Sequence, residues 1–222
     1  MGKANDKSVR QPLVRTARIL DLRVEARADG AESRTISGYA VRFNEWSKPF
    51  WGEWIEMIEP GAFDNCDMSD VIMCTDHGVD CADVLARRRD GQGSLTIEVD
   101  EQGVRFSFDA PNTTRGNDIL ELVRRGDISE CSFRFIVSKD RWVWKSMSKG
   151  MEYDQRVISA IEKLVDLSIV VSGKYLKTSA VSERSAVNEL RQEAFGSSDQ
   201  SRRAFAEIAR ERVELYEKMA TI

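Results

Sequence analysis

The chain has 222 residues, of which 41% are hydrophobic and 32% charged, and its net charge is −4 at pH 7. This length fits one moderate domain with an appendage. Basic and acidic residues are interspersed, and no apolar run approaches the roughly 20 residues of a membrane span. We therefore expect no nucleic-acid partner and no membrane partner.

The cysteines indicate the redox state of the cellular compartment in which the protein acts. There are four, Cys66, Cys74, Cys81 and Cys131, and none forms a Cys-x-x-Cys pair. A chain of this size does not depend on disulfides for its core, so we expect reduced thiols. The polar start of the chain lacks the apolar segment of a secretory signal. Together these features predict a cytoplasmic protein, and no motif in the sequence requires a cofactor.

In chain order, the polar and basic stretch 1–15 predicts a mobile arm. Residues 16–182 form the predicted main domain, in which apolar alternation and turn residues mark short strands. Helical spacing predicts short helices around 62–66 and at 117–125. The expected strands lie at 19–26, 34–43, 54–58, 70–75, 95–99, 104–108, 126–137, 142–144, and at 156–162 and 163–171, which are two strands or one bent strand.

This pattern predicts an α+β fold, a strand-rich closed barrel flanked by short helices, because many short strands with few long helices need closure. The loop 44–54 carries Trp46, Trp51 and Trp54. It is either a local cluster that covers a barrel end or a substrate-facing surface. We favour the first interpretation, since tryptophan is usually buried.

The composition changes after residue 182. Residues 183–222 contain no proline and are rich in Glu, Arg and Ala, with apolar residues at helical spacing. The pattern predicts a helix around 185–195, a break at 196–198 and a second helix around 200–219. We expect this charged helical tail to dock on the domain or to bind a partner.

The strand 126–137 carries the first candidate for chemistry. Strand alternation places Cys131 and Phe133 on one face and Ser132 and Arg134 on the other. Ser132 is a candidate nucleophile, and Cys131 is an alternative because Cys/His pairs also act as nucleophiles. Only one of these two neighbours can face a base on an adjacent strand.

His77 is the one histidine of the chain and follows an apolar strand. An imidazole takes up and returns a proton near neutral pH, so His77 is a candidate general base. A competing interpretation is a zinc site made by Cys66, Cys74, His77 and Cys81, although this spacing does not match the paired knuckles of common zinc sites.

Asp166 lies in an otherwise apolar strand, where a carboxylate is costly unless it is paired. It forms either a structural ion pair with an arginine or the third member of a Ser–His–acid triad, in which it would orient the imidazole. A hydroxyl, an imidazole and a carboxylate on separate strands are the components of a serine hydrolase.

Several stretches, taken in order over about residues 35–182, resemble the prohead (capsid maturation) proteases of tailed bacteriophages, the HK97 type, which are related in fold to herpesvirus assemblin. The ordered set of matching stretches is more specific than any one of them. The stretches are Ser37–Asn44, Ile58–Phe63, Val71–His77, Gly116–Asp118, Gly126–Ile128, Ser132–Phe135 and Asp166–Val170.

The resemblance implies a serine endopeptidase over 16–182 with Ser132 as nucleophile and His77 as general base. Asp166 stands where the family usually has glutamate. As oxyanion donors we expect backbone amides of the loop 87–93.

The resemblance also implies how such an enzyme is used. It would cleave the major capsid protein or scaffold inside the immature phage head, in the host cytoplasm, with self-cleavage and homo-oligomerisation as open possibilities. The alternative is a non-catalytic capsid assembly or scaffold protein of the same fold.

Overall fold

The computed structural model describes residues 13–17, 22–26, 32–78, 80–147, 150–171 and 187–192. The chain divides into two units, Met1–Gly173 and Lys174–Ile222. Every strand among the described residues belongs to the first unit. In the second unit, residues 187–192 are helical and lie inside the helix predicted around 185–195. The helix predicted around 200–219 lies outside the described residues.

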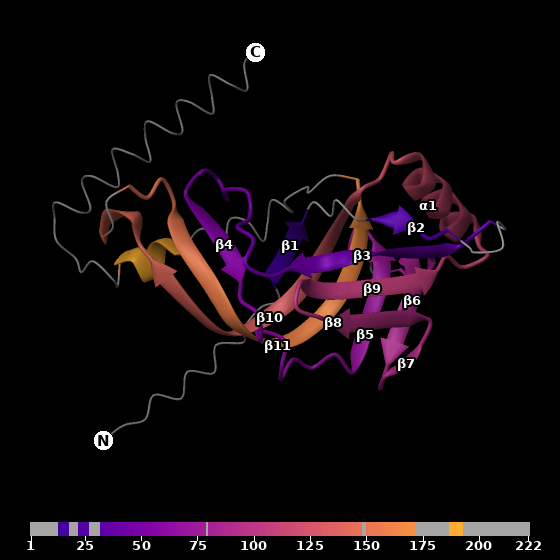
Figure 1. Ribbon diagram of the computed structural model, residues 1–222, viewed down its shortest axis with the longest axis horizontal. Helices are drawn as coiled ribbons and strands as arrows, with labels where there is room; N and C mark the ends of the chain where they lie inside the picture. The colour runs from indigo at the N-terminus through magenta and orange to yellow at the C-terminus, as the bar shows by residue number, and fades with distance from the viewer. Residues whose placement is uncertain are drawn as a thin grey trace, which may run out of the picture. The chain divides into compact units, whose positions relative to one another are not determined.

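The larger sheet has seven strands (Figure 1). Six of them follow one path, and β4 (Trp54–Ile58) pairs with β11 off that path. Strands β4 and β5 run parallel to β11, whereas the other pairs are antiparallel. The path is β1 (Leu13–Ala17), β10 (Glu130–Val143), β11 (Asp154–Val170), β5 (Asp70–Thr75), β6 (Val84–Arg89) and β7 (Gln92–Gly93).

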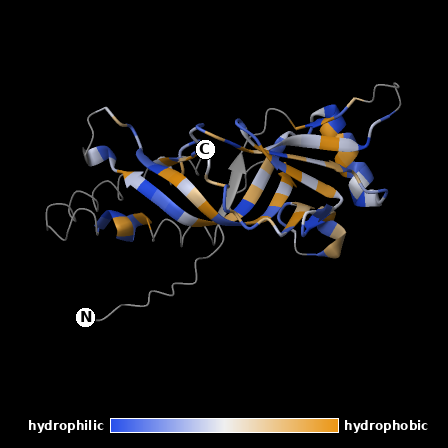
Figure 2. Cartoon of the chain, turned by 60° about the horizontal axis from the view of Figure 1, so that its bottom comes forward, coloured by the Kyte–Doolittle hydropathy of each residue, from blue (hydrophilic) through white to orange (hydrophobic). Residues whose placement is uncertain are grey.

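The smaller sheet has four strands in the order β2 (Arg23–Val24), β3 (Thr35–Arg42), β9 (Gly103–Asp109) and β8 (Leu95–Val99). In Figure 1 its strands run across β5, β6 and β7. Hydrophobic and hydrophilic residues alternate along the strands (Figure 2), and one apolar core joins residues of both sheets. Each sheet therefore buries one face against the other.

The prediction of a closed barrel is wrong, because neither of the two sheets closes on itself. β1, β4 and β7 are edge strands of one sheet, and β2 and β8 are the edges of the other. Stacking two sheets face to face buries their apolar faces without joining the edges, so the many short strands do not require closure. The α+β, strand-rich character of the prediction is confirmed.

Helix α1 (Thr114–Arg125) begins three residues before the predicted position. The hydroxyl of Thr113 accepts a hydrogen bond from the backbone N–H of Gly116 and so caps the first turn. Gly116 has to be glycine, because a Cβ there would lie 2.1 Å from the carbonyl oxygen of Pro111. The helix ends at Arg125, as the predicted range 117–125 has it, and Gly126 caps it with a left-handed φ of 77°.

Other local differences have physical causes. Residues 60–65 form turns rather than a helix, with Gly61 at φ 86°. β6 was not predicted, because three consecutive arginines end it and hide its alternation. β11 is one bent strand, and β1 begins inside the stretch expected to be an arm. The predicted strands 54–58 and 70–75 and the hairpin of β8 and β9 are confirmed.

The long β10–β11 ladder consists of two halves with different neighbours. The β5 half comprises Glu130–Arg134 opposite Asp166–Val170, with β5 beside β11. The β4 half comprises Lys139–Val143 opposite Gln155–Ala160, and β4 lies beside Asp154–Ile158 of β11.

The tryptophan loop packs on the β4 half of the ladder. The ring centroids of Trp51 and Trp54 are 4.9 Å apart, and those of Trp54 and Trp142 are 6.1 Å apart. Trp54 is fully buried, whereas Trp46 is exposed and lies outside this cluster. The local-cluster interpretation therefore holds for Trp51 and Trp54, although no barrel end exists for them to cover.

Candidate active site

The β-sheet register places the predicted residues side by side. Ser132 on β10 is opposite Ser168 on β11, and Arg134 is opposite Asp166. Alternation puts these four side chains on one face of the larger sheet, because the intervening Cys131, Phe133 and Leu167 belong to the apolar core. The polar face of the β5 half is therefore the face turned away from the smaller sheet.

His77 reaches this face through a tight turn after β5. Asp76 and His77 have φ of 47° and 54°, left-handed values that are uncommon outside glycine. The backbone N–H of His77 donates to Ser168 Oγ at 2.8 Å, and that of Gly78 donates to the Thr75 carbonyl at 2.8 Å. These hydrogen bonds hold the strained turn so that the imidazole lies over the ladder.

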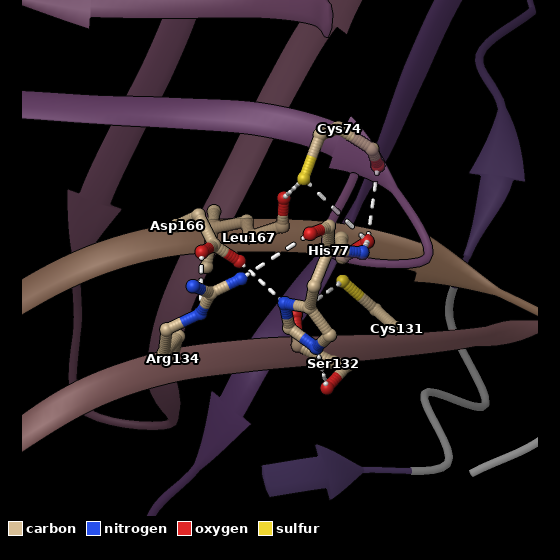
Figure 3. A network of polar contacts seen from close by, with 8 residues as sticks. Cys74, His77, Cys131, Ser132, Arg134, Asp166 and Leu167 are labelled. Atoms are coloured by element: carbon tan, nitrogen blue, oxygen red, sulfur yellow. Dashed lines mark hydrogen bonds and ion pairs between the residues drawn. The ribbon is translucent and has the colours of Figure 1, made fainter. Parts of the chain in front are cut away.

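The three predicted residues form a continuous chain of contacts (Figure 3). His77 Nε2 lies 2.5 Å from Ser132 Oγ, and His77 Nδ1 lies 2.6 Å from Asp166 Oδ1. An ionised carboxylate only accepts hydrogen bonds, so Nδ1 carries the proton and Nε2 is free to accept the proton of Ser132. In this tautomer the imidazole is a general base positioned on the hydroxyl.

The side chains of the site are largely buried. Ser132 is fully buried, and the side chains of His77 and Asp166 are 7% and 9% exposed. Low exposure strengthens the electrostatic interaction between imidazole and carboxylate.

Arg134 also belongs to the site, although its sequence context indicated no role. Its Nε lies 2.9 Å from Asp166 Oδ2, and its terminal nitrogen donates to the His77 carbonyl at 3.3 Å. The Nε–H is not directed at the carboxylate oxygen, so this contact is an ion pair rather than a linear hydrogen bond. The available signal was its position two residues after Ser132, on the same strand face.

Cys131 does not face the base. Its side chain lies in the core on the opposite side of β10, and its thiol donates to the Ser132 carbonyl. Burial raises the pKa of the Cys131 thiol to about 12, so almost none of it is thiolate at neutral pH. Geometry and protonation state therefore both disfavour Cys131 as the nucleophile.

The competing interpretation, a zinc site, is not supported by the geometry, although all four of its proposed ligands lie in the described part of the chain. Cys74 donates to the Leu167 carbonyl at 3.6 Å, Cys81 is exposed, and both ring nitrogens of His77 contact Ser132 and Asp166. Within the described residues, no three His, Cys, Asp or Glu residues cluster as metal ligands.

The loop expected to supply oxyanion donors lies at the wrong end of β5. Arg89 pairs with Asp70 at the start of the strand, whereas Val84 pairs with Cys74 near its end, where His77 follows. The tip of this loop, beyond Arg89, therefore lies about 13 Å along the strand from the level of Ser132, which is opposite Ser168 and, through it, Cys74. Two amides of this loop already have partners, since Arg87 N–H donates to Ser94 Oγ at 3.2 Å and Asp90 N–H donates to the Ser69 carbonyl at 2.6 Å.

Comparison with known proteins identifies relatives of this chain. The family model of the caudovirus prohead serine proteases matches residues 21–193. A solved structure of the bacteriophage T4 capsid assembly protease, gp21, aligns with 10% identity and a TM-score of 0.43, covering 72% of this chain and 97% of that one. No curated protein sequence matches the chain. Across the described residues, no helix is long and apolar enough to cross a membrane. With the family model covering most of its length, the chain belongs to the caudovirus prohead serine protease family.

Proposed function

We propose that this chain is a serine endopeptidase that cleaves capsid or scaffold proteins inside the immature phage head, with Ser132, His77 and Asp166 as its catalytic residues. The observation that supports this proposal is the continuous series of contacts from the Ser132 hydroxyl through the His77 imidazole to the Asp166 carboxylate. A hydroxyl, a base and an orienting acid at these distances are the parts that acyl transfer needs.

The geometry supports a two-step reaction. As Ser132 Oγ attacks the scissile carbonyl, its proton passes to His77 Nε2, and Asp166 stabilises the imidazolium. The tetrahedral intermediate collapses when His77 gives that proton to the leaving amine, which produces an acyl-enzyme. Water activated by the same imidazole then hydrolyses the ester and regenerates Ser132.

The test is co-expression with the coat protein of the phage that encodes this chain, followed by mass spectrometry of the fragments. Wild type should cut the coat protein or scaffold at defined positions, and Ser132→Ala and His77→Ala should each leave it intact while keeping their fold. Cleavage near the wild-type rate in either variant would contradict the assignment. Binding of coat protein without cleavage by wild type would favour the non-catalytic assembly role.

The proposal extends to the chain's own tail. The sequence places a charged segment, 183–222, after the strand-rich domain. Linkers between such units are exposed to proteolysis, and an attached segment meets its own enzyme at high effective concentration. In this view the tail recruits the enzyme into the assembling shell, and its removal releases the enzyme.

Intact mass against time, at two protein concentrations, tests this extension. Wild type should lose part or all of 183–222, and Ser132→Ala should stay full length. Equal shortening of both proteins would indicate a contaminating protease. If neither shortens while coat protein is still cut, the tail is a permanent docking element and the release idea is wrong.

A further inference from the structure

A guanidinium lies beside the carboxylate that orients the base. Arg134 and Asp166 are directly opposed on β10 and β11, and their side chains meet on the same face as Ser132 (Figure 3). The two carboxylate oxygens are divided between two partners: Oδ1 contacts His77 Nδ1, and Oδ2 contacts Arg134 Nε. Asp166 is therefore fixed from both sides.

The first consequence is electrostatic. The Asp166 side chain is only 9% exposed, and its Oδ2 lies 2.9 Å from Arg134 Nε. Because little water screens this pair, the attraction between the guanidinium and the carboxylate is stronger than it would be at the protein surface. This attraction holds the carboxylate against β10.

The second consequence is geometric. A carboxylate that is held at one oxygen only can rotate about its terminal bond, a torsion with a broad energy profile. The contact with Arg134 limits this rotation and keeps Oδ1 directed at the imidazole. Arg134 also donates to the His77 carbonyl at 3.3 Å, so one side chain ties the acid to the turn that carries the base.

We propose that Arg134 is a positioning residue of the active site, which keeps the Asp166 carboxylate aligned through their ion pair and fastens the His77 turn to β10. This inference rests on the proposed function, because it presupposes that Ser132, His77 and Asp166 act together. Arg134 does not touch the hydroxyl that reacts, so its effect passes through Asp166 and His77.

The same two strands offer a matched control. In the β4 half, Arg156 Nε lies 2.6 Å from Asp140 Oδ2, again between β11 and β10. Arg156 also contacts Glu56 at 3.4 Å and lies over the Trp142 ring, and its side chain is more buried than that of Arg134. Removing Arg156 should therefore disturb the fold at least as much as removing Arg134.

The experiment compares Arg134→Met, Arg134→Lys and Arg156→Met in the full chain, using a coat-protein peptide that wild type cuts. The measurements are kcat, KM and Tm. We expect Arg134→Met to lower kcat about 10- to 100-fold with KM within about twofold, because misplacing a catalytic group costs this much. Arg134→Lys should recover part of kcat, since it keeps the charge without the rigid fork. Arg156→Met should lower Tm but leave kcat unchanged.

Two results would overturn the inference: kcat in Arg134→Met within twofold of wild type, or an equal loss of kcat in Arg156→Met. Equal kcat in Arg134→Lys and Arg134→Met would overturn its electrostatic part. Ser132→Ala separates this inference from the proposed function. If Ser132→Ala is inactive and Arg134→Met is fully active, only the role of Arg134 fails. If Ser132→Ala still cuts the peptide, the proposed site itself fails.

Discussion

The two halves of the β10–β11 ladder are built alike and differ in chemistry. In each half, β11 has β10 on one side and a parallel strand on the other, β5 or β4. Each half has an Arg–Asp ion pair between β10 and β11. The β4 half also buries polar groups, since Asp154 is 2% exposed and accepts from the backbone N–H of Lys145. Buried carboxylates and cross-strand arginines therefore do not by themselves make a site.

The difference lies in the turn after the parallel strand. After β4 the chain turns at Pro60 and Gly61 and continues along β11, where Ile161 N–H donates to the Ala62 carbonyl, and this segment carries no titratable ring. After β5, the left-handed Asp76 and His77 fold the chain back over the ladder, and the imidazole lies between a hydroxyl and a carboxylate. The turn at His77, which a hydrogen bond to Ser168 holds in place, is therefore what distinguishes the β5 half, with its candidate triad, from the β4 half, with its structural ion pair.

The largest effect should separate the two aspartates. Asp166→Asn keeps the shape but presents a donor where His77 needs an acceptor, so we expect cleavage to fall by up to about 10⁴-fold. Asp140→Asn removes the corresponding carboxylate of the β4 half and should leave kcat unchanged. Steady-state kinetics on both variants provide the test. A drop below about tenfold for Asp166→Asn would mean that another group orients His77.

A smaller effect should follow from loosening the turn. Ser168→Ala removes the acceptor of the His77 backbone N–H, a hydrogen bond worth about 1 kcal/mol, so we expect kcat to fall about fivefold. Ser159→Ala, which removes the hydroxyl that donates to the Lys139 carbonyl beside the β4 half, is the matched control and should have no effect on kcat. Equal rates in both variants would show that the turn does not depend on Ser168.

The smallest effect should come from the thiol beside the nucleophile. Cys131→Ala should retain most activity, because the Cys131 side chain points into the core. Burial raises the pKa of Cys131 to about 12 and that of Cys74 and Cys66 to about 11, so these groups remain thiols at neutral pH. Iodoacetamide should therefore label the exposed Cys81 in the folded protein without stopping cleavage. Loss of cleavage in a folded Cys131→Ala variant would instead indicate a thiol protease.

The sequence located the three candidate residues but not the way they meet. Alternation correctly separated Ser132 from Cys131, since period-two geometry depends only on local backbone. The left-handed turn at His77 could not be predicted, because it depends on Ser168, 91 residues away. Arg134 was missed for the same reason: its partner Asp166 becomes its neighbour only through the register of β10 and β11. Likewise, sheet closure depends on packing between sheets rather than on strand patterns.

Covalent labelling tests the central claim most directly. The protein is incubated with excess fluorophosphonate, digested and analysed by mass spectrometry, alongside His77→Ala and Arg156→Met. We predict one adduct, on Ser132, in wild type and Arg156→Met, and no adduct in His77→Ala, because only a hydroxyl activated by its base reacts. An adduct on another residue, equal labelling of His77→Ala, or an unlabelled Ser132 in a preparation that cuts coat protein would contradict the claim.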